Sequence, residues 1–218
     1  MRKLLLIVTF ILTLASIWIA LTLGAVEGPT ANPESPVRNI VYIHVPGSIC
    51  ALFCFVVLLT GSVGYLVTSR PKWDILAAAS AEAGTIFAAI SNVTGSVFSR
   101  AEWNIWWTPS PRLISAAILL LLYIVYLILR SSLAASPRRK ARICAVFGIV
   151  AFIDVPMVII SARFIPDIHR PDFSFSSSWQ SAAFVLSVAA MMLLGAVMIS
   201  FKADILRIKN RLDEQSFS

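Results

Sequence analysis

The stretch LLLIVTFILTLASIWIALTLG, from Leu4 to Gly24, carries no charged residue in 21 positions. As an α-helix rising about 1.5 Å per residue, it would cross the hydrocarbon core of a bilayer, which is about 30 Å thick. Arg2 and Lys3 precede it as in a signal peptide, but the apolar run is longer than a signal core and lacks a clean cleavage site, so we expect a retained helix. Five more long stretches with at most one charge follow: Val45–Thr68, Ile75–Ser99, Leu113–Leu129, Ile143–Ala162 and Trp179–Phe201.

The composition of the whole chain agrees with these six stretches. Of the 218 residues 58% are hydrophobic and only 13% are charged, about half the charged fraction of a soluble domain. An ordinary soluble fold is therefore excluded, and we predict an all-α membrane protein whose six transmembrane helices lie within residues 1–205. The apolar and charged residues that alternate after Phe201 predict a cytoplasmic amphipathic tail over residues 202–218.

The basic residues predict the orientation of the helices. The formal net charge of +7 resides in short segments between apolar runs, so it indicates topology and no nucleic acid partner. With a cytoplasmic N-terminus, thirteen of the 18 Lys and Arg residues are inside and five are outside. Both termini are then cytoplasmic, in a bacterial inner membrane. The periplasmic loops are Ala25–Asn39, Arg100–Arg112 and Arg163–Ser178.

The chain has only two histidines, and both are predicted at the outer face. His44 stands in YIHVP where the second helix begins, and His169 stands in PDIHRP ahead of the sixth helix. The simplest interpretation is a pair of interfacial histidines that bind water and lipid headgroups. The prolines beside them, and a tryptophan-rich outer loop that lies between them in sequence, favour the alternative, which is that both are metal ligands.

The loop between the third and fourth helices is rich in tryptophan. It reads RAEWNIWWTPSPRL and places Trp103, Trp106 and Trp107 within five positions between Arg100 and Arg112. A single tryptophan commonly anchors a helix at the headgroup level, but three indoles beside two cations form a flat apolar surface with a charged rim. Such a surface suits a planar apolar ligand with acidic groups. Haem is one, and its iron would lie between His44 and His169, with its propionates at Arg100 or Arg112.

These residues resemble the WWD signature of the haem-handling proteins of cytochrome c biogenesis. The six helices, the YIHVP segment and the WxxWW run followed by Pro-Arg-Leu are similar to the cytochrome c maturation protein C family over roughly residues 1–205. That family's loop usually reads Trp-Gly-x-Trp-Trp-x-Trp-Asp-x-Arg-Leu. The three tryptophans, Arg112 and Leu113 match this pattern, whereas three residues depart from it: Asn104, Pro109 and Ser110.

The resemblance implies a haem-delivery subunit without catalytic residues. In that role the outer loop, His44 and His169 hold non-covalent, b-type haem at the periplasmic face and present it to a membrane-tethered haem chaperone. The resemblance also implies assembly with the subunits of an ABC transporter, which drives release of the loaded chaperone. No bond of a substrate is broken by this subunit.

Four further residues within the predicted spans are candidates because polar groups are costly there. Glu82 lies among small residues that let another helix approach, so we expect a structural hydrogen bond. Asp154 precedes Pro156, which is expected to kink the fifth helix, and a structural carboxylate with satisfied hydrogen bonds is favoured over a role in the haem site. Cys50 and Cys54 lie four positions apart on one helix face, where a disulfide would be strained, so we expect buried thiols.

Two other functions remain open at this stage. A haem b-bearing anchor of a respiratory complex also uses paired histidines, but it holds its haem between helices deep in the membrane and gives the tryptophan loop no role. A transporter of small solutes would show internal repeats or paired broken helices, and the sequence shows neither.

Overall fold

The computed structural model describes residues 2–22, 39–165, 175 and 177–216. All regular structure in these residues is helical, and six stretches are long and apolar enough to cross a membrane, which confirms the predicted all-α class with six spans. The seven helices are α1 (Arg2–Thr22), α2 (Val41–Thr68), α3 (Pro71–Trp103), α4 (Pro111–Ser132), α5 (Pro137–Ala151), α6 (Asp154–Phe164) and α7 (Ser178–Ser216).

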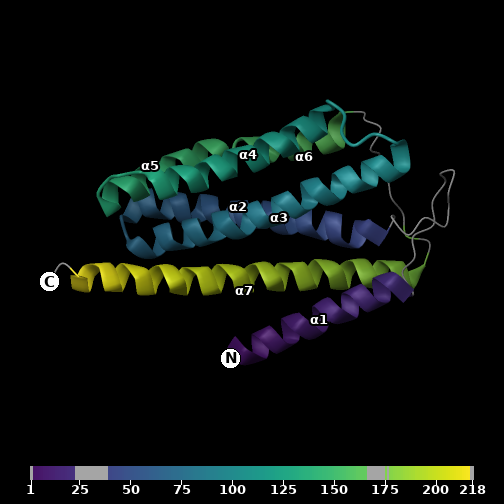
Figure 1. Cartoon of the computed structure of the whole chain (residues 1–218), viewed down its shortest axis with the longest axis horizontal. Helices are drawn as coiled ribbons and strands as arrows, with labels where there is room; N and C mark the ends of the chain where they lie inside the picture. The colour runs from purple at the N-terminus through teal and green to yellow at the C-terminus, as the bar shows by residue number, and fades with distance from the viewer. Residues whose placement is uncertain (1, 23–38, 166–174, 176, 217–218) are drawn as a thin grey trace.

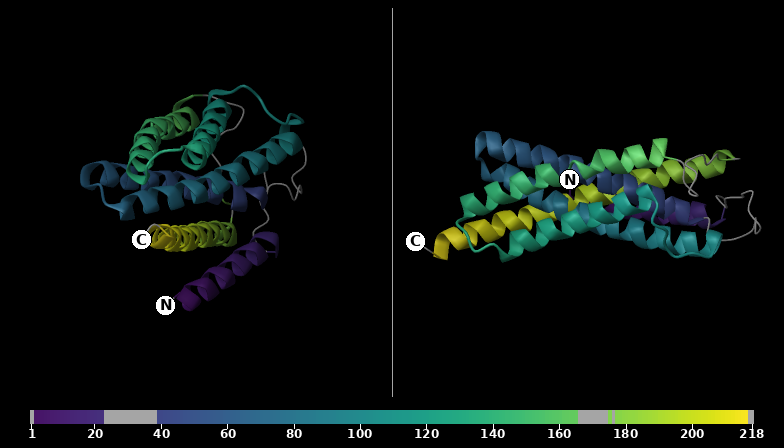
Figure 2. Two further views of the ribbon diagram at one scale, coloured as in Figure 1. Left: turned by 60° about the vertical axis from the view of Figure 1, so that its left-hand side comes forward. Right: turned by 90° about the horizontal axis from the view of Figure 1, so that it is seen from above.

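The helices form an up-and-down bundle in layers (Figure 1). The antiparallel pair α2 and α3 forms the middle layer, α4, α5 and α6 cover one face of it, and α7 covers the other. Helix α1 lies at the edge and contacts α7, from which it diverges toward its N-terminus. Figure 2 shows the same arrangement from two further directions. Helix α3 therefore stands near the centre of the molecule, in contact with α2, α4, α5 and α7.

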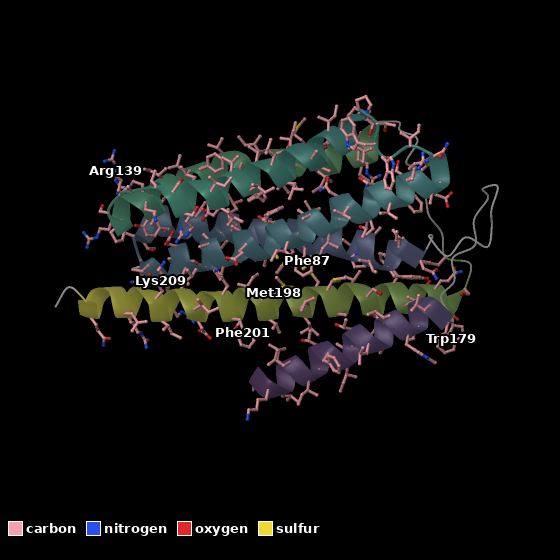
Figure 3. The ribbon with its side chains drawn as sticks, viewed as in Figure 1. Phe87, Arg139, Trp179, Met198, Phe201 and Lys209 are labelled. Atoms are coloured by element: carbon pink, nitrogen blue, oxygen red, sulfur yellow. The ribbon has the colours of Figure 1, made fainter. Side chains whose placement is uncertain are left out.

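The bundle has two ends. The tryptophan end is where α3 stops at Trp103 and α4 begins at Pro111, and the turn end is where α2 turns into α3 at Ser69. At that turn Ser69 has φ 54°, and its N–H donates to the carbonyl of Tyr65 at 2.7 Å, which ends α2. The N-terminal end of α1 and the C-terminal end of α7 point toward the turn end, and Figure 3 shows Arg139 and Trp179 at opposite ends.

Helices α2 and α3 are longer than the apolar stretches that predicted them. Helix α3 has 33 residues, or about 50 Å of helix, so its charged first and last turns extend beyond a hydrocarbon core of about 30 Å. Proline at position 71 suits the first turn, which has no intrahelical use for that N–H. The sequence had placed Trp103 in the loop after the third helix. In the structure Trp103 is instead the last residue of α3.

The fifth span is interrupted, as Pro156 predicted. Helix α5 ends at Ala151, a turn occupies Phe152 and Ile153, and α6 starts at Asp154. Proline 156 has no N–H to donate to the carbonyl four residues earlier, at Phe152. The N–H of Val155 donates to that carbonyl instead, at 3.0 Å. The interruption lets α6 pack against α4, while α5 packs against both α2 and α4.

The last span continues without a break into the charged tail. Helix α7 has 39 residues and ends at Ser216, which corresponds to about 58 Å of helix. The predicted tail is thus a helical extension of the span, and three large apolar side chains in it are exposed: Ile205, Ile208 and Leu212.

Small residues bring the helices close together in the half of the bundle toward the turn end. A Cβ at Gly61 would lie 2.8 Å from the backbone nitrogen of Ala77, and a Cβ at Gly84 would lie 2.6 Å from Cε1 of Phe55. The ring of Phe55 stacks on Tyr123, with centroids 3.6 Å apart, so this contact joins α2 to α4. Because only hydrogen atoms fit at both glycines, Gly61 lies against the backbone of α3 and Gly84 lies against the ring of Phe55.

Two ion pairs attach α3 to its neighbours. Both oxygens of Asp74 accept from the guanidinium of Arg130 in α4, at 2.8 and 2.7 Å. Glu82 pairs with Lys202 of α7, with 2.6 Å between Oε2 and Nζ. Glu82 therefore has a partner on another helix, as expected of a structural carboxylate.

Candidate functional site

A cavity of about 390 Å³ opens at the tryptophan end. Its walls come from α2, α3, α4 and α6, together with the segment that joins α3 to α4. The lining includes one histidine, three tryptophans and two arginines: His44, Trp103, Trp106, Trp107, Arg112 and Arg163. The structure thus brings together five of the seven residues that the sequence had indicated.

His44 lies in the first turn of α2 and is half-buried against α3. Its Nδ1 lies 2.9 Å from the carbonyl oxygen of Ser91 and 3.3 Å from Oγ1 of Thr94. A carbonyl can only accept a hydrogen bond, so Nδ1 carries the proton. In the neutral imidazole the lone pair then resides on Nε2, which makes this nitrogen the one suited to bind a metal.

The approach of His44 to α3 depends on Gly95. A Cβ at position 95 would lie 2.9 Å from Cε1 of the imidazole and 3.3 Å from Nδ1. Neighbouring hydroxyls join the same two helices, since Ser48 and Ser91 are 2.5 Å apart through their Oγ atoms. The histidine is therefore held by small and hydroxyl-bearing residues of α3.

The three tryptophans differ in how much of each indole is exposed. Trp103 is half-buried, and its ring is nearly perpendicular to that of Phe98, with centroids 5.6 Å apart. Trp106 is 60% exposed and Trp107 is 47% exposed. Two of the indoles thus present apolar area to the surroundings of the cavity, where a ligand or a partner would cover it.

Of the three described arginines at the tryptophan end, two line the cavity and one does not. Arg112 in α4 and Arg163 in the last turn of α6 both line the cavity. Arg100 is not among the lining residues, because its guanidinium donates to the carbonyl of Asn104 at 2.6 Å and lies over the ring of Trp106 at 5.9 Å. No acidic residue is among the described lining residues, so the cavity carries net positive charge and favours an anionic ligand.

The sequence alone did not indicate Arg163, Gly95, Ser91 or Thr94. A signal for three of them was present, since SNVTGSVFS is an unusually polar run for the end of a membrane helix. Which of its residues faces His44 depends on the packing of α2 on α3. In the sequence Arg163 was indistinguishable from a topological charge, and only the fold shows that it lines the same cavity as Arg112.

The second predicted ligand, His169, lies outside the described residues, as do the neighbouring positions 166–174. Its assignment therefore stays a prediction. The described chain ends on one side of this gap at Ile165, two residues after Arg163, and resumes at Phe175.

Two of the three departures from the family's loop pattern keep a conformational role. Asn104 replaces glycine and has φ 59°, a left-handed conformation that asparagine adopts more readily than most other residues. Ser110 replaces aspartate as the N-cap of α4, where its Oγ accepts from the N–H of Leu113 at 3.4 Å, and both residue types are preferred caps. Pro109 stands where the pattern has its last tryptophan, so this loop has one indole fewer than the pattern.

The remaining candidates do not line the cavity. Asp154 starts α6, and its Oδ2 is buried without a hydrogen-bond partner among the described residues, so the expectation of a satisfied carboxylate is wrong for this oxygen. All three cysteines are buried thiols elsewhere in the bundle, and Cys50 donates to the carbonyl of Met191 at 3.3 Å.

Comparison with known proteins identifies the family. The model of the family described as "Heme exporter protein C" matches residues 1–218. The chain belongs to this family. A protein named "Heme exporter protein C" from Bradyrhizobium diazoefficiens is 32% identical over 143 residues, which is 66% of this chain and 54% of that protein.

Two further relatives extend the match within the family. The "Heme exporter protein C" of Escherichia coli K12 is 26% identical over 204 residues, or 91% of this chain and 81% of that protein. A Marchantia polymorpha protein named "Putative cytochrome c biosynthesis ccmC-like mitochondrial protein" is 24% identical over 156 residues, or 72% and 62%. The alignments with the Bradyrhizobium and Marchantia proteins thus span between half and two thirds of those relatives.

Proposed function

We propose that this protein binds haem in the cavity at the tryptophan end and delivers it to a membrane-tethered haem chaperone for cytochrome c maturation. The observation that carries the proposal is that one cavity joins His44, three indoles and two guanidinium groups. These groups match the three chemical parts of haem, which are a metal ion, an apolar ring and carboxylates.

Each group has a separate role in this proposal. Nε2 of His44 ligates the iron, because Nδ1 already carries the proton that the carbonyl of Ser91 accepts. The indoles of Trp106 and Trp107 cover apolar area of the ring. Arg112, with Arg163 or Arg100, pairs with the propionates, since guanidinium and carboxylate form two parallel hydrogen bonds.

His169 is the proposed second axial ligand. It is the only other histidine, and it lies six residues beyond Arg163, which lines the cavity. The haem is held without covalent bonds to this chain, because none of the chain's three cysteines lines the cavity. Haem held in this way is b-type and can be passed on intact, so we propose a binding and delivery subunit that is no enzyme.

The proposed surroundings follow from the family and from the charges. The basic residues favour a cytoplasmic turn end and a periplasmic tryptophan end in a bacterial inner membrane. The exposed Trp106 and Trp107 would then meet the chaperone in the periplasm. Subunits of an ABC transporter are proposed as the other partners, in the complex that releases the loaded chaperone.

The position of His44 supports delivery over the alternative of a respiratory haem anchor. His44 lies in the first turn of its helix, at the end of the bundle, where a second protein can reach the ligand. An anchor subunit would hold its haem nearer the middle of the span, which here is closed by stacked Phe55 and Tyr123.

Transfer of haem tests the proposal. The purified full-length protein is loaded with haem and mixed with the apo form of the haem chaperone from the same bacterium. We expect haem to appear on the chaperone, and we expect His44→Ala to lower haem loading and to reduce the amount transferred. A loaded protein that retains its haem in the presence of apo-chaperone, and instead undergoes reversible reduction by a quinol, would contradict delivery and favour the anchor.

A further inference from the structure

The face of α3 formed by Ser91, Thr94 and Gly95 contacts the imidazole of His44 and forms a seat for it. We infer that this seat holds the imidazole in one orientation before haem arrives, so that Thr94 and Gly95 are positioning residues for haem binding. The inference rests on the proposed function, since it concerns how the proposed ligand is presented.

The hydrogen bonds of the seat fix the tautomer and the tilt of the ring. The carbonyl oxygen of Ser91 accepts from Nδ1 at 2.9 Å, and Oγ1 of Thr94 lies 3.3 Å from the same nitrogen. Thr94 is itself held in place, because its hydroxyl donates to the carbonyl of Ile90 at 2.7 Å. With Nδ1 bound on the α3 side, Nε2 is the nitrogen that carries the lone pair.

Contact with Gly95 sets how deeply the ring lies against α3. A Cβ at position 95 would be 2.9 Å from Cε1, 3.3 Å from Nδ1 and 3.9 Å from Nε2. A methyl group 2.9 Å from Cε1 overlaps the ring. The imidazole is rigid, so the whole ring would have to move away from α3. Because glycine in a helix costs about 1 kcal/mol relative to alanine, its presence here is consistent with a need for this space.

The backbone that carries the imidazole is attached to the same seat. Ser48 donates to the carbonyl of His44 at 2.8 Å, and its oxygen lies 2.5 Å from Oγ of Ser91. The helix turn of His44 and the helix turn of Ser91 are therefore joined by two hydroxyls as well as by the imidazole. Rotation of the side chain away from α3 would break the Nδ1 bond without moving the backbone.

Because the seat already holds the imidazole of His44 in one orientation, this side chain loses no rotational freedom when it binds the iron. Groups that orient a ligating histidine through its other ring nitrogen are commonly worth 10–100-fold in metal affinity. The seat accordingly raises haem affinity without contacting haem, and its removal should change the strength and geometry of the His44 bond while the cavity stays intact.

The test compares two Gly→Ala variants of the full-length protein. Gly95→Ala places a methyl against the imidazole, whereas Gly47→Ala adds one in α2 that meets nothing nearer than the carbonyl oxygen of Phe87, at 4.0 Å. Haemin titration followed by the Soret band gives the affinity, and the low-spin EPR signal reports ligand orientation. We expect Gly95→Ala to bind haemin about 10–100-fold more weakly with a changed EPR signal, and Gly47→Ala to match the wild type.

A second pair of variants, at Thr94, tests the seat even if Gly95→Ala fails to fold. Thr94→Val keeps the shape of the side chain but removes the hydroxyl, and Thr94→Ser restores it. We expect a shifted EPR signal and weaker binding for the valine variant only, with rescue by serine.

The outcomes separate this inference from the proposed function. Wild-type affinity and EPR signal in both Gly95→Ala and Thr94→Val, together with weaker haem binding in His44→Ala, would overturn the seat but leave haem binding by His44 in place. Wild-type haem binding in all three variants would overturn the proposed role of His44 itself.

Discussion

The two ends of the bundle are built from the same helices but packed in different ways. Toward the turn end, Gly61 and Gly84 let α2 and α3 touch, and Asp74 and Arg130 join α3 to α4. Toward the tryptophan end, the same α2, α3 and α4 surround a cavity of about 390 Å³. The comparison indicates that the turn end supplies stability and leaves the tryptophan end able to keep an open site.

The contrast has a local cause in each helix. In α3 the alanines and glycine around Glu82 give way to hydroxyl-bearing residues near Ser91, which face the cavity and His44. In the fifth span the interruption at Phe152 separates α6 from α5, so that Arg163 reaches the cavity rim. Substitutions at the turn end should therefore change stability, and substitutions of the residues that line the cavity at the tryptophan end should change ligand binding.

The largest effect on stability is expected at the ion pair between Asp74 and Arg130. Their side chains are only 17% and 20% exposed, so Arg130→Met would leave a largely buried carboxylate without its partner and cost about 3–5 kcal/mol. Unfolding in detergent, followed by circular dichroism, measures the loss. Arg207→Gln is the matched control, because Arg207 is 52% exposed in its pair with Asp204 and such pairs are worth about 0–1 kcal/mol. Equal losses in both variants would contradict the view that burial makes the pair of Asp74 and Arg130 stabilising.

Two small-to-larger substitutions compare the ends directly. Gly84→Ala would push its methyl into Phe55, 2.6 Å away, and should destabilise the protein by about 1–3 kcal/mol. Ala116→Leu fills part of the cavity and should change stability by no more than about 0.5 kcal/mol. It should also lower haem affinity about tenfold, which corresponds to about 1.4 kcal/mol. Haemin titration and thermal unfolding of both variants check this, and a cavity variant that binds haemin normally would count against the proposed site.

The exposed indoles should affect binding and hardly affect folding. Trp106→Ala and Trp107→Ala each remove apolar contact worth about 1–3 kcal/mol of haem affinity, and unfolding should shift by about 0.5 kcal/mol or less. Pro109→Trp adds an indole and should strengthen binding. Trp18→Ala is the control, because Trp18 is 61% exposed on α1, away from the cavity. If Trp18→Ala lowers affinity as much as the other two, the indoles are membrane anchors only.

The smallest effect is expected at the N-cap of α4. Ser110→Ala removes the oxygen that accepts from the N–H of Leu113 and should cost about 0.5–2 kcal/mol of stability. Ser110→Asp should restore the wild-type value, since aspartate is an equally good cap. Thermal unfolding of the two variants measures this capping role. If Ser110 bound haem directly, Ser110→Asp would instead change the haem affinity, which haemin titration measures.

Much of the fold was predictable because it depends on apolar length and on proline. Residue type along the chain was enough to predict the six spans and the interruption near Pro156. It also predicted that Glu82 makes a structural contact with another helix. The helix ends were not predictable, because hydropathy marks the membrane core and α3 continues in water beyond it to Trp103.

The site was predictable in part for a different reason. His44, the tryptophans and Arg112 are chemically unusual residues for a membrane helix end, so the sequence alone indicated them. Arg163 and Gly95 are ordinary residues that acquire meaning through neighbours more than 45 positions away in sequence. The role of Arg100 also depended on geometry, because only the fold shows that it bonds to Asn104 and stacks over Trp106.

The central claim is that the cavity at the tryptophan end holds haem through His44, and absorption spectra of the purified haem-loaded protein test it most directly. Spectra are compared for the wild type, His44→Ala, His169→Ala and the double variant at equal protein concentration. We predict a six-coordinate low-spin spectrum in the wild type, lower haem occupancy with altered bands in each single variant, and no specific haem in the double variant. A double variant with the wild-type spectrum and occupancy would contradict the claim.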